Sequence, residues 1–367
     1  MRDPRVDSLA RILVRYSVEL KEGDTCLIEG ASAGEPLIAA VYEEVLAAGG
    51  HPAVSMSVEG QPATFFKHAS DAQLEWVSPL AKWAAEESDC RIGIGADTNT
   101  RELSGVPPDR QTKRRMATRH LMKTTLRRDA EGTHRWVYTL FPTNGYAADA
   151  EMSLGEFEDF YYRACLVEDP DPLGAWRRAS EECKRLAEWA QDHEEIRVTA
   201  PGTDIKLGIS KRTFIVADGT RNMPDGEFFT APIEDSVEGE VSFDLPAMVS
   251  GHEVAGVRLR FESGKVVDAR AERGEEFLVS LLDTDEGARR LGELGIGTNY
   301  GIDRGTRDVL LDEKIGGTVH MAVGASYPEC GGKNESAVHT DLVCDLRQGG
   351  RIEVDGQAFQ ENGRFLV

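Results

Sequence analysis

The sequence lacks the signatures of several common protein classes. None of its six cysteines forms a C-x-x-C pair, and a chain of 367 residues is far too long for a small disulfide scaffold, so buried free thiols are expected. No apolar run approaches the roughly eighteen residues that a membrane-spanning helix needs. No nucleotide-binding fingerprint such as G-x-G-x-x-G is present. Disulfide-rich, membrane-spanning and dinucleotide-binding classes are therefore not expected.

Positive charge is also scarce. The chain has 42 Lys and Arg residues against 64 Asp and Glu residues, which gives a formal net charge of −22. Nucleic acids and anionic membranes are polyanions, so neither is expected as a partner. The locally basic segment 110–128 is predicted to be the solvated face of a helix. The opening segment MRDPRVDSLARIL is typical of a helix start and not of a signal peptide, so we expect a cytoplasmic protein.

The first half of the chain alternates short apolar strands with amphipathic helices. Strands are predicted at 25–30, 52–58, 91–96 and 136–141, with helical periodicity between them. Such alternation is typical of an α/β domain, in which a mainly parallel sheet carries helices on both faces.

The pattern of predicted secondary structure changes after a helix predicted at 173–192. Short strands separated by glycine turns follow, and VRLRFESGKVVDA alternates apolar and polar residues around Ser263-Gly264, as a hairpin does. We therefore predict an α/β domain over residues 1–195. An α+β domain rich in antiparallel strands is predicted over 196–367.

Residues with metal-binding chemistry concentrate in the second domain. His320, Tyr327, His339 and Asp341 lie within twenty-two residues, although the whole chain has only eight histidines. His339 and Asp341 form an H-x-D pair, and residues two apart on a strand point to the same face. An imidazole and a carboxylate side by side are what a divalent metal site requires.

Two further carboxylates stand beside glycine turns. Glu227 follows a Pro-Asp-Gly turn in PDGEFFTAP, and Glu293 lies in GELGIGTN. Taken singly, each signal has an ordinary explanation, because an H-x-D pair can be a surface feature and a lone glutamate is usually solvated. Together, three carboxylates and two imidazoles suggest a site for two metal ions.

These motifs resemble a known family. The ordered set PDGEFFTAP, GELGIGTN, H-x-A-x-G-x-S-Y and H-x-D is similar to the thermophilic metallo-aminopeptidases, which include aminopeptidases T and S. The resemblance extends over nearly the whole chain, from ELKEGDTCLIEG through FPTNGYAADAEMSLGEFEDF to these motifs. It implies two divalent ions, zinc or cobalt with manganese also suited. It also implies the ligands Glu227, Glu293, His320, His339 and Asp341, with Tyr327 at the metal centre, and a homodimer.

The function implied is hydrolysis of the first peptide bond of short peptides. Two neighbouring ions can share a bridging water and lower its pKa toward neutrality. Glu293 and Tyr327 are the residues expected to take part in catalysis, with Tyr327 acting as a weak ligand or stabilising the oxyanion. The general base and the preferred N-terminal residue are left open by the sequence.

Two other functions fit parts of the pattern. His320, His339 and Asp341 alone make the two-histidine, one-carboxylate set of non-haem iron oxygenases, and some ring-cleaving dioxygenases resemble this peptidase family. A non-catalytic protein stabilised by one metal ion is the third possibility. Glu227 and Glu293 favour the hydrolase, because a single iron would not need them.

Overall fold

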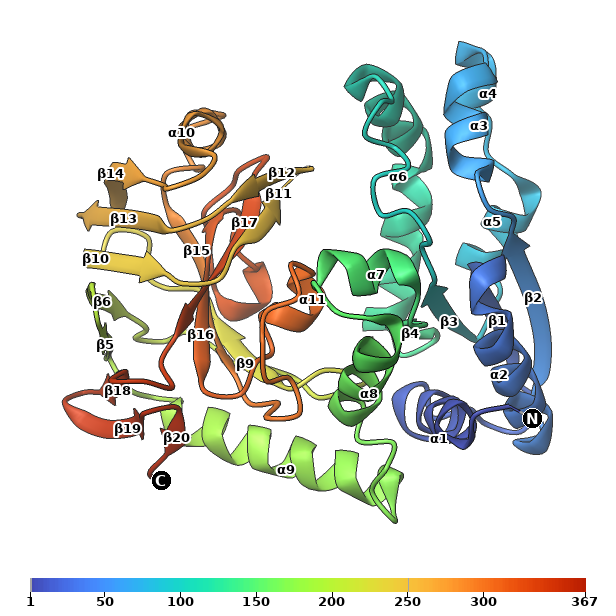
Figure 1. Ribbon diagram of the computed structural model, residues 1–367, viewed down its shortest axis with the longest axis horizontal. Helices are drawn as coiled ribbons and strands as arrows, with labels where there is room; N and C mark the ends of the chain where they lie inside the picture. Colours follow the sequence, from blue (N-terminus) through green and yellow to red (C-terminus); the bar gives the residue numbers. More distant parts are fainter. Residues whose placement is uncertain (1, 250) are drawn as a thin grey trace. The chain divides into compact units, whose positions relative to one another are not determined.

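A computed structural model describes residues 2–249 and 251–367 and divides the chain into two units (Figure 1). The first consists of Met1–Trp176 and Gly219–Pro224. The second consists of Arg177–Asp218 and Asp225–Val367. Among the described residues, no helix is both long and apolar enough to cross a bilayer.

The first unit is built on a five-stranded sheet in the order β2-β1-β3-β4-β8, with every neighbouring pair parallel. Parallel neighbours need crossover connections, and helices supply them here. The four strands predicted from apolar runs are all present, which confirms the α/β class. The strands are β1 (Thr25–Ala31), β2 (His51–Ser57), β3 (Cys90–Gly95), β4 (Arg135–Leu140) and β8 (Asn222–Met223).

The helices of the first unit begin where the local sequence provides caps. Asp3 accepts a hydrogen bond from the backbone of Arg5 to start the first helix, and a capping box of Ser153 and Glu156 starts the eighth. The helices are α1 (Pro4–Ile12, continued by a π-helical turn at Leu13–Ser17), α2 (Glu35–Ala47), α3 (Gln61–His68), α4 (Asp71–Glu75), α5 (Pro79–Glu86), α6 (Pro108–Ala130), α7 (Asn144–Asp149) and α8 (Leu154–Ala164).

The division between the units falls inside α9 (Pro172–Ala190). From Arg177 onward the helix belongs to the second unit, because Cys183, Leu186 and Ala190 pack into that unit's core. The sequence placed the boundary after this helix, at 195/196. A change from helix to strand is visible in a sequence, whereas the surface against which a helix packs is not.

The second unit contains two large sheets. The first has eight strands in the order β14-β13-β10-β6-β5-β18-β19-β20, and its neighbouring pairs are antiparallel. The hairpin predicted around Ser263-Gly264 is the β13–β14 pair. Its strands are β5 (Glu195–Ala200), β6 (Thr203–Gly208), β10 (Glu238–Phe243), β13 (Val257–Glu262), β14 (Lys265–Arg270), β18 (Arg351–Val354), β19 (Gln357–Glu361) and β20 (Arg364–Phe365).

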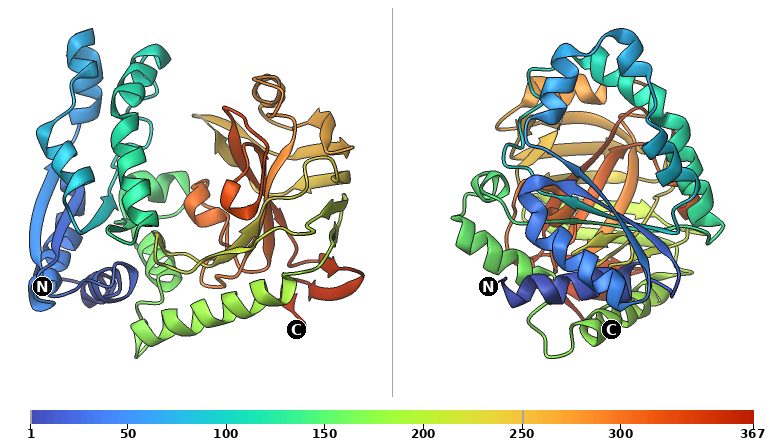
Figure 2. Two further views of the ribbon diagram at one scale, coloured as in Figure 1. Left: turned by 180° about the vertical axis from the view of Figure 1, so that it is seen from behind. Right: turned by 90° about the vertical axis from the view of Figure 1, so that its right-hand side faces the viewer.

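The second large sheet has five antiparallel strands in the order β17-β16-β15-β9-β7. These are β7 (Ile215–Ala217), β9 (Glu227–Thr230), β15 (Leu291–Gly297), β16 (Thr318–Gly324) and β17 (His339–Asp345). Side chains of both large sheets, such as Ile205 and Leu259 from one and Ile296 and Met321 from the other, form one core. Figure 2 shows the ribbon from two further directions. The antiparallel strands predicted for the second part of the chain are thus confirmed.

A small sheet and two helices complete the second unit. The small sheet pairs β11 (Ala247–Val249) with β12 (His252–Val254). The helices are α10 (Glu275–Leu282) and α11 (Val309–Asp312). Short 3-10 turns occur at Ser32–Gly34 in the first unit and at Pro328–Cys330 in the second.

Candidate metal centre

The residues that the motifs singled out lie on one face of the five-stranded sheet of the second unit. Glu293 on β15 stands opposite Ala322 on β16, and Ala322 stands opposite Asp341 on β17. Directly opposed residues of antiparallel strands share a face, as do residues two apart on one strand. His320 and His339 each lie two residues before a member of this row. The strand register therefore brings four of the predicted ligands to one face.

Glu227 completes the set from the neighbouring strand. It is the first residue of β9 and pairs with Gly297, which shares the face of Glu293. The carboxylate is 5% exposed. Sixty-six residues separate Glu227 from Glu293 in the chain, yet one strand pairing places both at the same site.

A β-bulge sets the orientation of Glu293. The register between β15 and β16 shifts between Leu291 and Glu293, and bulges of this kind redirect a side chain. Gly292 lies within the shift, where a Cβ atom would stand 2.2 Å from the carbonyl oxygen of Ala325. Only glycine allows this close approach of the two backbones.

Small residues make room for the larger side chains. Gly295 lies opposite His320, and a Cβ atom at Gly295 would stand 2.0 Å from Cε1 of the imidazole. The ring of His320 therefore lies over the glycine. Ala322, which is fully buried, separates Glu293 from Asp341 across the strands.

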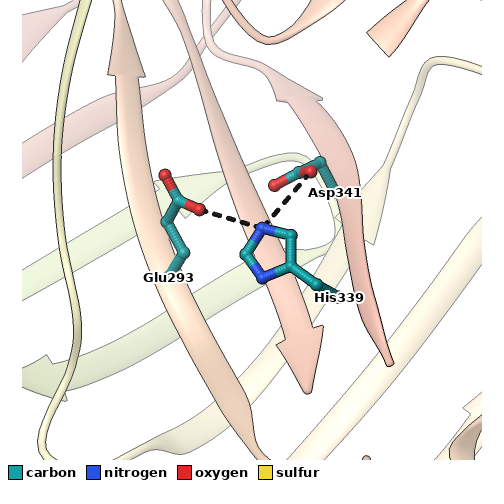
Figure 3. A group of neighbouring side chains, drawn as sticks. All are labelled: Glu293, His339 and Asp341. Carbon is teal, nitrogen blue, oxygen red and sulfur yellow. Dashed lines mark ion pairs between the residues drawn. The ribbon is translucent and has the colours of Figure 1, made fainter. Parts of the chain in front are cut away.

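The carboxylates and imidazoles lie close enough to one another to bind the same metal ion. Nε2 of His320 is 3.5 Å from Oε1 of Glu293, and Nε2 of His339 is 3.3 Å from Oε2 of the same residue. Nε2 of His339 is also 3.7 Å from Oδ2 of Asp341 (Figure 3). The two oxygens of Glu293 thus face two different imidazoles.

Backbone carbonyls orient both imidazoles. Nδ1 of His320 is 3.0 Å from the carbonyl oxygen of Glu313, and Nδ1 of His339 is 2.8 Å from that of Ala325. A carbonyl only accepts, so each Nδ1 must carry the proton and donate it. In each neutral imidazole this leaves the lone pair on Nε2, directed toward the carboxylates, as in the outer shell of known metal sites.

Two residues at the site were missed in the sequence. Lys314 is fully buried, and its ammonium lies 3.2 Å from Oε1 of Glu227, 3.8 Å from Oδ1 of Asp225, and in contact with the carboxylate of Glu313. Glu313 also joins His320 and Asp341 in a group whose ligand atoms all lie within 4.8 Å of one another. The Asp-Glu-Lys run before Gly316-Gly317 was the available signal, but it has no histidine beside it.

Burial and mutual repulsion perturb the carboxyl groups. Burial raises the pKa of Glu227 to about 8 in spite of the nearby Lys314. Burial likewise raises the pKa of Asp341 to about 6. Burial opposes ionisation of Glu293 as well, but hydrogen bonds with His320 and His339 lower its pKa to about 2. Glu293 is therefore the carboxylate whose negative charge the surroundings favour most.

The pKa values of the two imidazoles are raised, although burial alone would lower them. Burial lowers the pKa of His320, but Glu227 and Glu293 raise it to about 10 overall. Burial also lowers the pKa of His339, and Glu293 and Asp341 raise it to about 9 overall. Both shifts report a strongly negative site, which attracts positive charge.

The donor set fits a metal ion. Oδ1 of Asp341 is buried and has no hydrogen-bond partner among the described residues. The buried Oε2 of Glu227 lies 3.3 Å from Nε2 of His320, in an ion-pair contact. Leaving a carboxylate oxygen buried and unpaired is costly, and a cation removes that cost. Besides the group of Glu313, a second group of ligand atoms within 4.8 Å consists of Glu293, His339 and Asp341. Asp341 belongs to both groups.

Tyr327 lies beside the centre. Its ring centroid is 5.3 Å from that of His339 in an edge-on contact and 5.3 Å from that of Phe229. The side chain is 41% exposed. Burial of the hydroxyl and the carboxylates of Glu293 and Asp341 raise the pKa of Tyr327, so the hydroxyl keeps its proton at neutral pH.

Comparison with known proteins identifies the family of this chain. The family model described as thermophilic metalloprotease (M29) matches residues 2–365. Aminopeptidase T of Thermus aquaticus is 30% identical over 77% of this chain and 76% of that protein. Aminopeptidase T of Thermus thermophilus is 26% identical over 96% of this chain and 94% of that protein.

Two solved structures share the fold of this chain. Wild-type AmpT from Thermus thermophilus superposes with a TM-score of 0.85 at 25% identity, covering 99% of each chain. The 2,5-dihydroxypyridine dioxygenase from Pseudomonas putida KT2440 superposes with a TM-score of 0.60 at 14% identity, covering 99% of this chain and 97% of that chain. The second likeness shows a shared fold alone.

The fold and the ligand-rich sheet face define a metal-dependent hydrolase. The chain belongs to the thermophilic metalloprotease family (M29). The resemblance inferred from the sequence motifs is thereby confirmed.

Proposed function

We propose that this chain removes N-terminal residues from short peptides by means of two divalent ions. It is a metal-dependent aminopeptidase, the activity named for its relatives. The observation that carries the two-ion proposal is the position of Glu293, whose oxygens face His320 and His339 separately. A carboxylate in that position suits a pair of ions with one imidazole each.

The proposed ligands are Glu227, Glu293, His320, His339 and Asp341, and the missed Glu313 could help His320 and Asp341 to hold an ion. Imidazole nitrogen with carboxylate oxygen suits zinc, cobalt or manganese better than calcium or magnesium. When bound, such ions acidify water and polarise a carbonyl group. Water adds to the carbonyl carbon, the carbon–nitrogen bond breaks, and the leaving amine takes up a proton.

Tyr327 and Glu293 are proposed to act in the reaction. Tyr327 retains its proton at neutral pH, because burial and the nearby carboxylates raise its pKa. A protonated hydroxyl can donate a hydrogen bond to the oxyanion that develops on the carbonyl oxygen. Glu293 stays ionised because the two imidazoles lower its pKa, so its negative charge would be available to hold the ions throughout the reaction.

The test combines metal analysis with hydrolysis. Purified protein should contain two zinc-like ions per chain and should release the chromophore from leucyl and arginyl chromogenic amides. A chelator should abolish the activity, and added zinc or cobalt should restore it. Full activity after exhaustive metal removal would overturn the proposal.

Location and assembly are also part of the proposal. All six cysteines are buried and free, which fits a reducing compartment such as the cytoplasm. A homodimer is proposed from the resemblance to the family. Sedimentation of the purified protein tests the assembly, and a mass equal to one chain at micromolar concentration would contradict it.

A further inference from the structure

A pocket of about 100 Å³ adjoins the metal centre in the second unit, and His339 and Asp341 line both. The rest of its wall is mainly apolar. The apolar side chains come from the β11 segment, the start of α11, and β17: Leu245, Ala247, Met248, Val249, Val309 and Val343. The pocket is therefore an apolar recess that opens beside two ligands.

The wall is fixed to the strand that carries those ligands. β17 is an edge strand of its sheet. The backbone N–H of Asp244 donates to the carbonyl oxygen of Val343 at 3.1 Å, and its carboxylate accepts from the backbone N–H of Asp345 at 3.0 Å. The segment that follows Asp244 thus begins at a fixed distance from Asp341.

Of the two carboxylates that line the pocket, Asp341 belongs to the metal centre and Asp312 is engaged by its own loop. Asp312 accepts from the backbone N–H of Thr306 at 2.7 Å, from its hydroxyl at 2.8 Å, and from the backbone N–H of Arg307 at 2.9 Å. The carboxylate of Asp312 therefore serves to hold its own loop. Arg307 also lines the pocket, and burying a cationic side chain against the apolar remainder of the wall would cost free energy.

We propose that this pocket receives the side chain of the substrate's N-terminal residue and selects a compact aliphatic one. The inference rests on the proposed function, which requires the first peptide bond to lie at His339 and Asp341. The N-terminal side chain branches from the carbon next to the reacting carbonyl, so it reaches a recess that shares those two residues.

The size of the recess sets the preference. An apolar cavity of about 150 Å³ accommodates benzene, so a recess of about 100 Å³ suits leucine, isoleucine, valine or methionine better than tryptophan. Each methylene that an apolar pocket recognises changes kcat/KM by about tenfold or more. Leucine should therefore exceed glycine and tryptophan as the N-terminal residue, and lysine should be a poor substrate.

The experiment uses the metal-loaded protein and a series of chromogenic amides that differ only in the amino acid. Leucyl amide should be cleaved at least about tenfold more efficiently than the glycyl, tryptophanyl and lysyl amides. Ala247→Phe, which fills the recess, should lower kcat/KM for the leucyl amide about tenfold relative to the glycyl amide. Met248→Ala, which enlarges it, should raise the ratio of phenylalanyl to leucyl hydrolysis.

The matched control is Val267→Phe, which adds an aromatic ring on β14 at a residue that is 44% exposed and outside the pocket. It should leave the leucyl to glycyl ratio unchanged. Leucyl dipeptides that differ only in the second residue show which substrate side chain the pocket receives. If Ala247→Phe or Met248→Ala changed only the preference for the second residue, the inference would be overturned.

The two proposals fail in different ways. If the metal-loaded protein hydrolyses none of the amides, the proposed function is wrong, and the pocket's assignment falls with it. If it hydrolyses them all with similar efficiency, or if Ala247→Phe and Met248→Ala leave the ratios unchanged, the aminopeptidase stands and the pocket's assignment alone is wrong.

Discussion

The two faces of the five-stranded sheet in the second unit have opposite characters. Along β15, β16 and β17, one set of alternate residues packs into the core, including Leu294, Met321 and Leu342. The other set carries the ionisable and small residues: Glu293, Gly295, His320, Ala322, Gly324, His339 and Asp341. One stretch of chain therefore supplies the support and the chemistry at alternate positions.

The difference shows how the site obtains its precision. A ligand on a strand is held as firmly as the core packing behind it, because close-packed interiors resist displacement. The residues on the core face are bulky and apolar, whereas those between the ligands are glycine and alanine. Changes on the core face should therefore reduce stability, and changes on the ligand face should reduce metal binding.

The largest effect is expected for neighbouring residues on β17. His339→Ala and Asp341→Ala should each lose metal and at least about a hundredfold in activity, since even outer-shell changes cost about 10–100-fold. Leu342→Ala, on the opposite face, should cost about 2–5 kcal/mol of unfolding free energy through the cavity it leaves. Its folded fraction should keep the wild-type metal content. Elemental analysis and denaturant unfolding measure the two outcomes.

The metal content of the two β17 variants tests this prediction directly. Either His339→Ala or Asp341→Ala with undiminished metal content and wild-type turnover would show that the H-x-D pair is a surface feature.

The next effect concerns the two glutamates. Glu227→Gln and Glu293→Gln keep the shape but remove one negative charge each, and two neighbouring dications repel strongly without it. Metal occupancy should fall below two per chain, and hydrolysis should fall by about two orders of magnitude or more, while the fold persists. Metal content and circular dichroism of both variants check this.

The same variants separate the hydrolase from the oxygenase. A wild-type stoichiometry of one iron per chain, unchanged in both variants, would favour a mononuclear centre of His320, His339 and Asp341. It would overturn the two-ion proposal.

A smaller effect is expected from one methyl group on the ligand face. Gly295→Ala would place a Cβ atom 2.0 Å from Cε1 of His320, so the imidazole must move. We expect metal affinity to fall about 10–100-fold, as for other changes that misorient a ligand. The control is Gly155→Ala in α8, where nothing lies within 4 Å of the added atom. Equal metal affinity of the two variants would contradict the placement of His320 over Gly295.

The last effect, which needs no substitution, is the dependence on pH. In the metal-free protein, contacts with carboxylates raise the pKa of His320 to about 10 and that of His339 to about 9, although burial opposes both shifts. A metal must displace these protons at neutral pH, so affinity should rise by roughly tenfold per pH unit for each proton displaced. Calorimetric titration in two buffers of different ionisation enthalpy measures the proton release.

The same groups affect the stability of the metal-free protein. A histidine whose pKa is raised on folding stabilises the fold fully below its unfolded pKa of about 6.5. That contribution is lost as pH rises through about 9 for His339 and about 10 for His320. Unfolding free energy that increases over this range would contradict the ion pairing described here.

Local patterns predicted what depends on neighbours in the chain. The period of two along a strand was enough to place His339 and Asp341 on one face, and apolar runs were enough to find the parallel strands. Glycine turns marked Glu227 and Glu293 as candidates, and the family resemblance assigned them to the metal centre, but their proximity depends on a strand pairing between distant segments that the sequence does not show. Glu313 and Lys314 were missed because their role depends on which groups tertiary packing encloses around Glu227.

The bulge between Leu291 and Glu293 has a consequence for how such sequences can diverge. A one-residue insertion or deletion inside a strand exchanges its two faces, which here would turn Glu293 into the core and Leu294 toward the ions. Substitutions leave that order intact. We therefore expect the lengths of β15, β16 and β17 to vary far less among related proteins than their amino-acid composition does.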